Sequence, residues 1–172
     1  MNRISLAEAA ARYADAGWPI FPLHEIRDGA CSCTVGPTCA HPGRHPRTRS
    51  GHHDATSDRD TITRWWHRWP TANLASPNGL AVIDLDGPEG AATWTALENE
   101  HGHVATATAQ TPHGRHLWYR IPKELTVPRR IRGLGPGIDL LGTGGYTLLP
   151  PSRVRCLKPD HRSGPEHYTW TD

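Results

Sequence analysis

The sequence predicts an α+β fold in one domain, on the basis of its mixed element pattern and its length. Helical patterns at 5–16, 58–69 and 89–101 are separated by short apolar runs bounded by glycine or proline, which are typical of strands. The chain has 172 residues, which is enough for one domain with a real core and marginal for two. Its 17 glycines and 16 prolines indicate many turns between these elements.

Cap and stop residues support the three helices. Ser5 followed by Glu8 is a capping-box pattern, and Gly17 ends the first helix. Residues 56–58 supply a cap for the second helix, whose tryptophans make one face heavily aromatic. That face predicts packing against a sheet, with base stacking as the less favoured alternative. Strands are predicted at 18–23, 73–76, 80–86, 106–110, 115–120 and 147–149 and around Asp139, and the chain after 153 reads as a loop.

The strand at 80–86 carries two acidic residues, Asp84 and Asp86. Because side chains alternate along a strand, both carboxylates project to the same face, about 7 Å apart along the chain. Two carboxylates on one face of an apolar strand repel each other unless a cation lies between them. Hard divalent ions such as Mg²⁺ or Mn²⁺ prefer oxygen ligands of this kind, so the sequence predicts a metal-binding strand.

A second cluster of metal-ligand residue types lies in a glycine- and proline-containing loop. Cys31, Cys33 and Cys39 are followed closely by His41 and His45. This set predicts a structural zinc site in which three thiolates and one of the two histidines bind the ion. The spacing leaves the choice between His41 and His45 open. The alternative is a reduced loop that holds cysteines and no metal.

Basic residues follow in the same loop and again after a later glycine turn. Arg44, Arg47 and Arg49 lie in a stretch without periodicity, and such arginines suit contacts to DNA phosphates. A solvated basic loop explains these arginines equally well. Arg115 and His116 open a predicted strand, where they could meet the phosphates of a nucleotide.

Charge and composition bear on location more than on partners. The formal net charge is +2. No stretch is apolar enough to span a membrane, and the first 16 residues lack the apolar run of a secretory signal. The expected location is the cytoplasm, where clustered cysteines are more often metal ligands than disulfides. Cys156 has no cysteine neighbour and is predicted to be a free thiol.

In their order along the chain, these segments resemble the N-terminal domain of bifunctional DNA primase/polymerases, in the archaeo-eukaryotic primase superfamily. The matching blocks are Gly-Trp-Pro-Ile-Phe-Pro at 17–22, Pro-Gly-Arg-His-Pro at 42–46, Val-Ile-Asp-Leu-Asp at 82–86, the segment 111–119, Gly-Ile-Asp at 137–139, Gly-Gly-Tyr at 144–146 and Pro-Pro-Ser at 150–152. The resemblance implies a primase-like fold with an RRM-like mixed or antiparallel sheet and flanking helices. It also implies a single domain over 1–172 with an inserted zinc-binding loop at about 28–50.

The resemblance also implies roles for individual residues. Asp84 and Asp86 match the family's first acidic motif and Asp139 its third, so these three would hold catalytic Mg²⁺ or Mn²⁺. His116 matches the histidine that contacts the phosphates of the incoming nucleotide. The implied partners are a DNA template and primer, nucleoside triphosphates and a separately encoded helicase.

Two further comparisons with the family pattern concern single positions. His45 matches the histidine of the family's Gly-Lys/Arg-His-Pro element, which favours it over His41 as the fourth zinc ligand. Leu141 and Thr143 stand where the pattern leads us to expect an arginine and an aspartate. The loss of this charged pair bears on nucleotide affinity and on activity.

The function predicted from these features is template-directed nucleotidyl transfer, a DNA primase or polymerase activity with dNTPs or NTPs. The alternative is a non-catalytic, zinc-containing DNA-binding module with a degenerate site. The Asp-Leu-Asp-Gly sequence also resembles the opening motif of haloacid-dehalogenase-type phosphatases, but here Pro88 follows the glycine where that motif continues with threonine.

Overall fold

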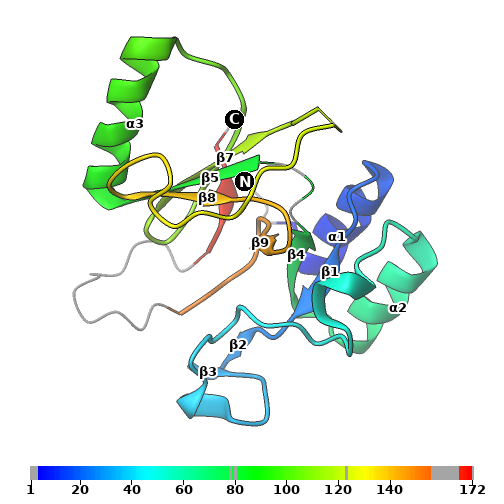
Figure 1. Cartoon of the computed structure of the whole chain (residues 1–172). Coiled ribbons are helices and arrows are strands. Elements are labelled where there is room, and N and C mark those ends of the chain that lie inside the picture. Colours follow the sequence, from blue (N-terminus) through cyan, green and yellow to red (C-terminus); the bar gives the residue numbers. More distant parts are fainter. Residues whose placement is uncertain (1–3, 78, 80, 123, 156–166, 172) are drawn as a thin grey trace.

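The computed structural model describes residues 4–77, 79, 81–122, 124–155 and 167–171 (Figure 1). Within these residues the fold comprises three α-helices and three antiparallel sheets, so the predicted α+β class is confirmed. Leu80 and Cys156, predicted as a strand residue and a free thiol, lie outside the described residues. In the described part of the chain, no helix is both long and apolar enough to cross a membrane.

The helices begin at the capping residues that the sequence predicts. The Ser5 hydroxyl accepts a hydrogen bond from the Glu8 N–H (3.1 Å), and the Glu8 carboxylate accepts one from the Ser5 N–H (2.7 Å). Asp58 caps the second helix by accepting from the Thr61 N–H (2.9 Å). The helices are α1 (Leu6–Asp15), α2 (Arg59–Arg68) and α3 (Gly87–His101), with short 3₁₀ helices η1 (Gly36–Thr38) and η2 (Gly51–Asp54).

The strands form two main sheets and one hairpin. The larger sheet has the order β10-β6-β7-β5-β8, the smaller one the order β1-β4-β9, and β2 pairs with β3. Their bounds are β1 (Phe21–Leu23), β2 (Ile26–Arg27), β3 (Ala30–Cys31), β4 (Asn73–Pro77), β5 (Ala81–Asp86), β6 (Ala107–Gln110), β7 (Gly114–Tyr119), β8 (Ile138–Leu141), β9 (Tyr146–Leu148) and β10 (Thr169–Trp170).

Helix α3 covers one face of the five-stranded sheet (Figure 1). Trp94 and Leu97 of α3 pack against a buried cluster on that face, because every second residue of the central strands is apolar. The cluster consists of Ile83, Leu85, Leu117 and Ile138. The residues between them, which include Asp84 and His116, therefore project to the opposite face.

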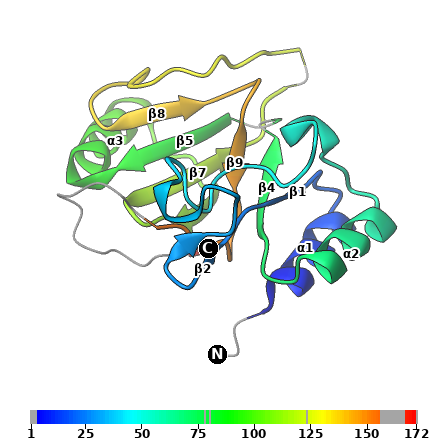
Figure 2. The same ribbon diagram turned by 90° about the horizontal axis from the view of Figure 1, so that it is seen from below.

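The opposite face of this sheet continues into the core of the N-terminal half. There Val82 and Trp118 pack with side chains from α1, α2 and β4, and both helices lie beside the three-stranded sheet (Figure 2). Asp84 follows Val82 on the same face, one pleat further along β5. The acidic pair thus begins at the margin of the apolar core.

The aromatic face of α2 packs in the core, which confirms the favoured interpretation for two of its tryptophans. Trp66 is 3% exposed and its Nε1 donates to the Ala72 carbonyl (3.1 Å). Trp65 packs against the same cluster. The prediction of a loop after 153 is wrong for Thr169–Trp170, which form β10 at the edge of the large sheet. A two-residue strand is too short to show a period, so the sequence carried no signal for it.

Candidate active site and metal centre

β5 lies between β7 and β8, and this position gathers four predicted site residues on one face of the sheet. Asp84 pairs with Asp139 on one side and with His116 on the other. Directly paired residues of an antiparallel sheet point to the same face, with Cα atoms about 4.5–5.5 Å apart. Asp86, two residues on, shares this face and pairs with Gly114. We name Asp84, Asp86, Asp139 and His116 the acidic row.

The imidazole of His116 is held within the acidic row. Its Nε2 lies 3.3 Å from Oδ1 of Asp84, and the two side chains are 6% and 23% exposed. The rings of Tyr168 and Trp118 flank the imidazole, with centroids 5.5 Å and 6.3 Å away. Among the described residues, nothing forms a hydrogen bond with the buried Nδ1 of His116. A buried ring nitrogen in this state costs free energy unless a water or a ligand atom meets it.

Asp139 has one carboxylate oxygen engaged by the backbone. Its Oδ1 accepts from the Arg132 N–H (2.8 Å), and the rest of the carboxylate remains available as an acceptor. Like charges directly opposite on neighbouring strands destabilise a sheet, so Asp84 and Asp139 favour a cation between them. Oxygen donors suit hard divalent ions, so the chemistry of this donor set fits such an ion.

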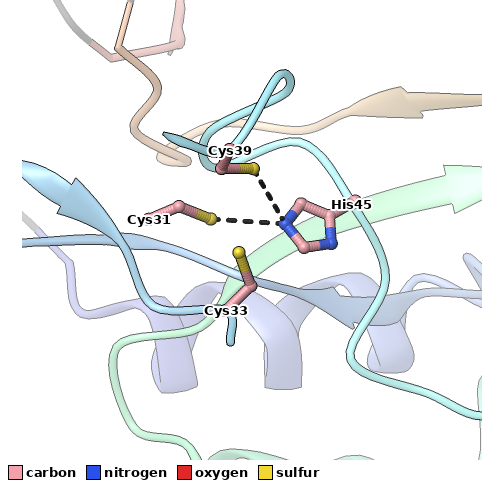
Figure 3. Close-up of side chains that lie close together, drawn as sticks. All are labelled: Cys31, Cys33, Cys39 and His45. Carbon is pink, nitrogen blue, oxygen red and sulfur yellow. Dashed lines mark hydrogen bonds between the residues drawn. The ribbon is translucent and has the colours of Figure 1, made fainter. Parts of the chain in front are cut away.

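The acidic row is less compact than the cysteine cluster. In the described part of the chain, only Cys31, Cys33, Cys39 and His45 form a group whose ligand atoms all lie within 4.8 Å of one another. Nε2 of His45 is 3.3 Å from Sγ of Cys31 and 3.4 Å from Sγ of Cys39 (Figure 3). A tetrahedral zinc ion with its usual bond lengths separates sulfur and nitrogen ligands by about 3.6 Å. The four residues therefore fit zinc.

The same geometry distinguishes the two histidines between which residue spacing could not choose, and it agrees with the resemblance that favoured His45. His45 points its Nε2 into the space between the three sulfur atoms (Figure 3). His41 is exposed and is not part of the cluster. The short β2–β3 hairpin and η1 bring Cys31 and Cys39 together, so the loop closes on itself around the ligand atoms.

A comparison with protein families identifies the chain. The family model described as bifunctional DNA primase/polymerase, N-terminal (Prim-Pol) matches residues 10–172, which include the acidic row and the cysteine cluster. The chain belongs to the Prim-Pol family. Membership indicates a DNA primase or polymerase activity with DNA and nucleotides as substrates. A search of curated proteins found no matching sequence.

Arg115 does not join the acidic row of this Prim-Pol chain. It pairs with Leu85, whose side chain packs on the α3 face, so Arg115 projects away from His116. It is exposed, and its positive charge helps to hold the pKa of Glu98 below the ordinary value, although the main cause there is the hydrogen bond from His103. The alternation rule alone could have separated Arg115 from His116, because they are consecutive on one strand.

The predicted zinc-binding loop at about 28–50, called the zinc loop below, contains Arg44, Arg47 and Arg49. These three arginines occupy different environments. Arg47 is turned inward: its Nη2 donates to the Glu25 carboxylate (2.7 Å) and to the Ser32 hydroxyl (2.8 Å), and its side chain is 11% exposed. Arg49 is exposed, and Arg44 is half-buried. The structure therefore places the Arg47 guanidinium inside the Prim-Pol fold, and its predicted contact with DNA has no support from this geometry.

Glu25 was not among the residues that the sequence pointed to. Its side chain is 4% exposed and also accepts from Arg27 Nη2 (2.8 Å). Burial by itself would raise the pKa of Glu25, but the hydrogen bonds and charge of Arg47 hold this pKa below its ordinary value. An isolated glutamate between two strands carries no pattern that predicts burial. Its role depends on Arg47 folding back over it.

Asn73, at the start of β4, ties the zinc loop to the sheet. Its Nδ2 donates to the Gly43 carbonyl (2.9 Å), and its Oδ1 accepts from the Arg153 N–H (2.8 Å). The residue is fully buried. This side chain links three segments that are far apart in sequence, and the sequence pattern held no signal for it.

Proposed function

We propose that this chain catalyses template-directed nucleotidyl transfer, adding dNTPs or NTPs to a 3′-hydroxyl on DNA by a two-metal mechanism. The proposal extends to one Prim-Pol domain over residues 1–172, with its zinc-binding loop at about 28–50. The observation that carries it is the register of β5, which pairs Asp84 with Asp139 and with His116.

The carboxylates of the acidic row have the role of holding the catalytic cations. Asp84 and Asp139 face each other, and Asp86 lies two residues further along on the same face. Mg²⁺ or Mn²⁺ bound there would acidify the attacking 3′-hydroxyl and neutralise charge on the pyrophosphate that leaves. The protein contributes the positions of the carboxylates and a partly buried setting, in which their interaction with cations is stronger than in water.

His116 is proposed to donate a hydrogen bond to a phosphate of the incoming nucleotide. Its ring is fixed by Tyr168 and Trp118 and by the contact with Asp84. A donor that is already oriented loses little entropy when it binds a ligand, so its contribution to affinity is large for one side chain.

The zinc site is proposed to be structural. Its four protein ligands leave no open position for a substrate, which is typical of zinc ions that stabilise a loop. The loop also supplies Arg44 and Arg49, which are the exposed or half-buried cations available for DNA or nucleotide phosphates.

One observation favours the competing function, a zinc-containing DNA-binding module with a degenerate site. Leu141 pairs with Val82 and packs against the N-terminal core, at a position where the family pattern led us to expect a charge. The polymerising site would then bind nucleotide less tightly than a family member with the full pattern.

A primer-extension assay separates the two functions. The chain is incubated with a primed DNA template, each nucleotide set and either Mg²⁺ or Mn²⁺, and the products are resolved on a gel. Primer extension by the wild type, together with no extension by an Asp139→Ala variant, supports nucleotidyl transfer. A DNA gel shift without extension under every metal and nucleotide condition refutes it and favours the binding module.

A further inference from the structure

The backbone of Arg44 is fixed within the zinc loop. Its N–H donates to the His41 carbonyl (3.1 Å), and its own carbonyl accepts from the Tyr146 hydroxyl (2.8 Å). Gly43 before it has φ 77° and packs so tightly that a Cβ there would lie 2.9 Å from a backbone oxygen. The next residue is His45, the histidine of the cysteine cluster. Arg44 is thus held at a defined place, unlike a residue of a solvated loop.

The zinc loop stands on the side of the large sheet where the acidic row projects. Figure 1 shows α3 on one side of that sheet and the β2–β3 hairpin on the other. In the perpendicular view of Figure 2, the hairpin lies in front of β5 and β7, and α3 lies behind them. Since Asp84 and Asp86 project away from α3, they face the side on which the zinc loop lies.

Tyr168 packs between the acidic row and the apolar cluster that Tyr146 joins. It is 3% exposed, and its ring packs 5.5 Å from the ring of His116. Burial raises the pKa of its hydroxyl to about 12, the charge of Arg44 acts to lower this pKa, and the charges of Asp84 and Asp86 act to raise it. Tyr168 also belongs to the apolar cluster against which Tyr146 packs, and the Tyr146 hydroxyl donates to the Arg44 carbonyl. Packing thus links the backbone of Arg44, through Tyr146 and Tyr168, to the ring of His116.

The guanidinium of Arg44 is not committed to a carboxylate. In the described part of the chain, Arg47 and Arg59 form ion pairs within 4.0 Å and Arg44 forms none. A guanidinium presents several N–H donors that match the oxygens of a phosphate group. A half-buried arginine of this kind, on the same side of the sheet as carboxylates that favour cations, suits an anion that itself carries metal.

We propose that Arg44 binds the triphosphate of the incoming nucleotide, forming the zinc-loop side of the nucleotide site. The inference rests on the proposed function, because it assumes that a metal-bound nucleotide occupies the acidic row. It also separates Arg44 from Arg49: the exposed Arg49 is left to the DNA backbone, although the sequence predicted DNA contacts for both.

The test measures nucleotide binding and DNA binding separately. The 172-residue chain loaded with zinc is given Mn²⁺ and a primed template whose primer ends in a dideoxynucleotide, so that the matching dNTP binds without transfer. Titration calorimetry gives the dNTP affinity, and a gel shift gives the affinity for the primed template. The variants are Arg44→Ala, Arg44→Lys and the control Arg49→Ala, and zinc content and circular dichroism verify that each is folded.

We expect Arg44→Ala to weaken dNTP binding about ten- to a hundredfold, the effect of one lost charge-assisted contact, and to leave template affinity within about twofold. Arg44→Lys keeps the charge, so it restores part of the affinity, and Arg49→Ala weakens the template alone. Unchanged dNTP affinity in Arg44→Ala, or a loss confined to the template, overturns the proposal. If the wild-type chain binds dNTP but does not extend a normal primer, the proposed nucleotidyl transfer is refuted. The dNTP affinities of the wild type and Arg44→Ala then still decide whether Arg44 binds the triphosphate.

Discussion

Asp84 of β5 and Asp139 of β8 are direct partners across one antiparallel strand pair, and His116 flanks Asp84 on its other side. Two carboxylates in this arrangement destabilise the sheet when no cation is bound, and the same arrangement binds a cation well. Stability without metal and activity with metal are therefore expected to respond in opposite directions when one charge is removed.

The first prediction concerns Asp139→Asn. The amide oxygen of the introduced asparagine can still accept the hydrogen bond from the Arg132 N–H, so this backbone contact is retained while the negative charge is lost. In the presence of a metal chelator, urea denaturation is expected to give the variant a free energy of unfolding equal to that of the wild type or up to about 1 kcal/mol higher. With Mn²⁺ we expect primer extension to fall at least about a hundredfold. Extension at the wild-type rate contradicts the metal role of Asp139.

The second prediction concerns the two histidines of the zinc loop. His45→Ala removes a ligand of the cluster and is expected to lose bound zinc and to expose the loop to protease, because a zinc ligand set contributes directly to folding. His41→Ala is the matched control, since His41 is exposed and lies outside the cluster. Zinc per chain is measured by atomic absorption. Loss of zinc in His41→Ala with retention in His45→Ala would reverse the assignment.

The third prediction concerns the buried pair of Glu25 and Arg47. Glu25→Gln leaves the Arg47 guanidinium in a buried site without its counter-charge, and removal of one partner of a buried pair typically costs about 3–5 kcal/mol. Asp15→Asn is the control: it breaks the exposed pair with Arg59 and is expected to cost less than about 1 kcal/mol. Urea denaturation at neutral pH measures both. Equal costs for the two variants would mean that burial adds nothing to the Glu25 pair.

The same pair predicts a pH dependence of stability. The folded protein holds the pKa of Glu25 below its ordinary value of 4.5, so the carboxylate binds protons less readily in the folded than in the unfolded chain. Its contribution to stability is fully present above the unfolded pKa and is lost as the pH falls through the folded pKa. The difference in unfolding free energy between wild type and Glu25→Gln is therefore expected to stay constant from neutral pH to about pH 5 and to shrink below it. A difference that grows in acid contradicts the assignment.

The fourth prediction concerns Gly114, which pairs with Asp86. A Cβ at this position would lie 1.7 Å from the Leu85 carbonyl oxygen, so Gly114→Ala forces β5 and β7 apart at the acidic row. We expect the free energy of unfolding to fall by about 1–3 kcal/mol and primer extension to fall markedly. At Gly79 a Cβ meets nothing within 4 Å, and Gly79→Ala is the control that should change neither. Wild-type stability in Gly114→Ala would mean that this strand pair is looser than the structure shows.

Local sequence patterns were sufficient to predict the helices and most of the strands. The capping box of Ser5 and Glu8 and the alternation around Asp84 depend on residues a few positions apart, and the sequence displays such spacings directly. The same rule was available for Arg115 and points it away from His116. The strand β10 could not be predicted from local pattern, because its two residues form a strand only by pairing with β6.

The sequence also pointed to the residue types of both candidate metal sites, because cysteine and aspartate in those local patterns are typical metal ligands. Spacing alone left open which histidine joins the cysteines, the family resemblance favoured His45, and Arg47 was predicted to contact DNA. The folded chain adds contacts between distant segments: His45 turns into the cysteine cluster, Arg47 closes over Glu25, and β8 aligns Asp139 with Asp84. Such contacts depend on how strands register and which charges become buried, and neither is encoded by the spacing of neighbouring residues.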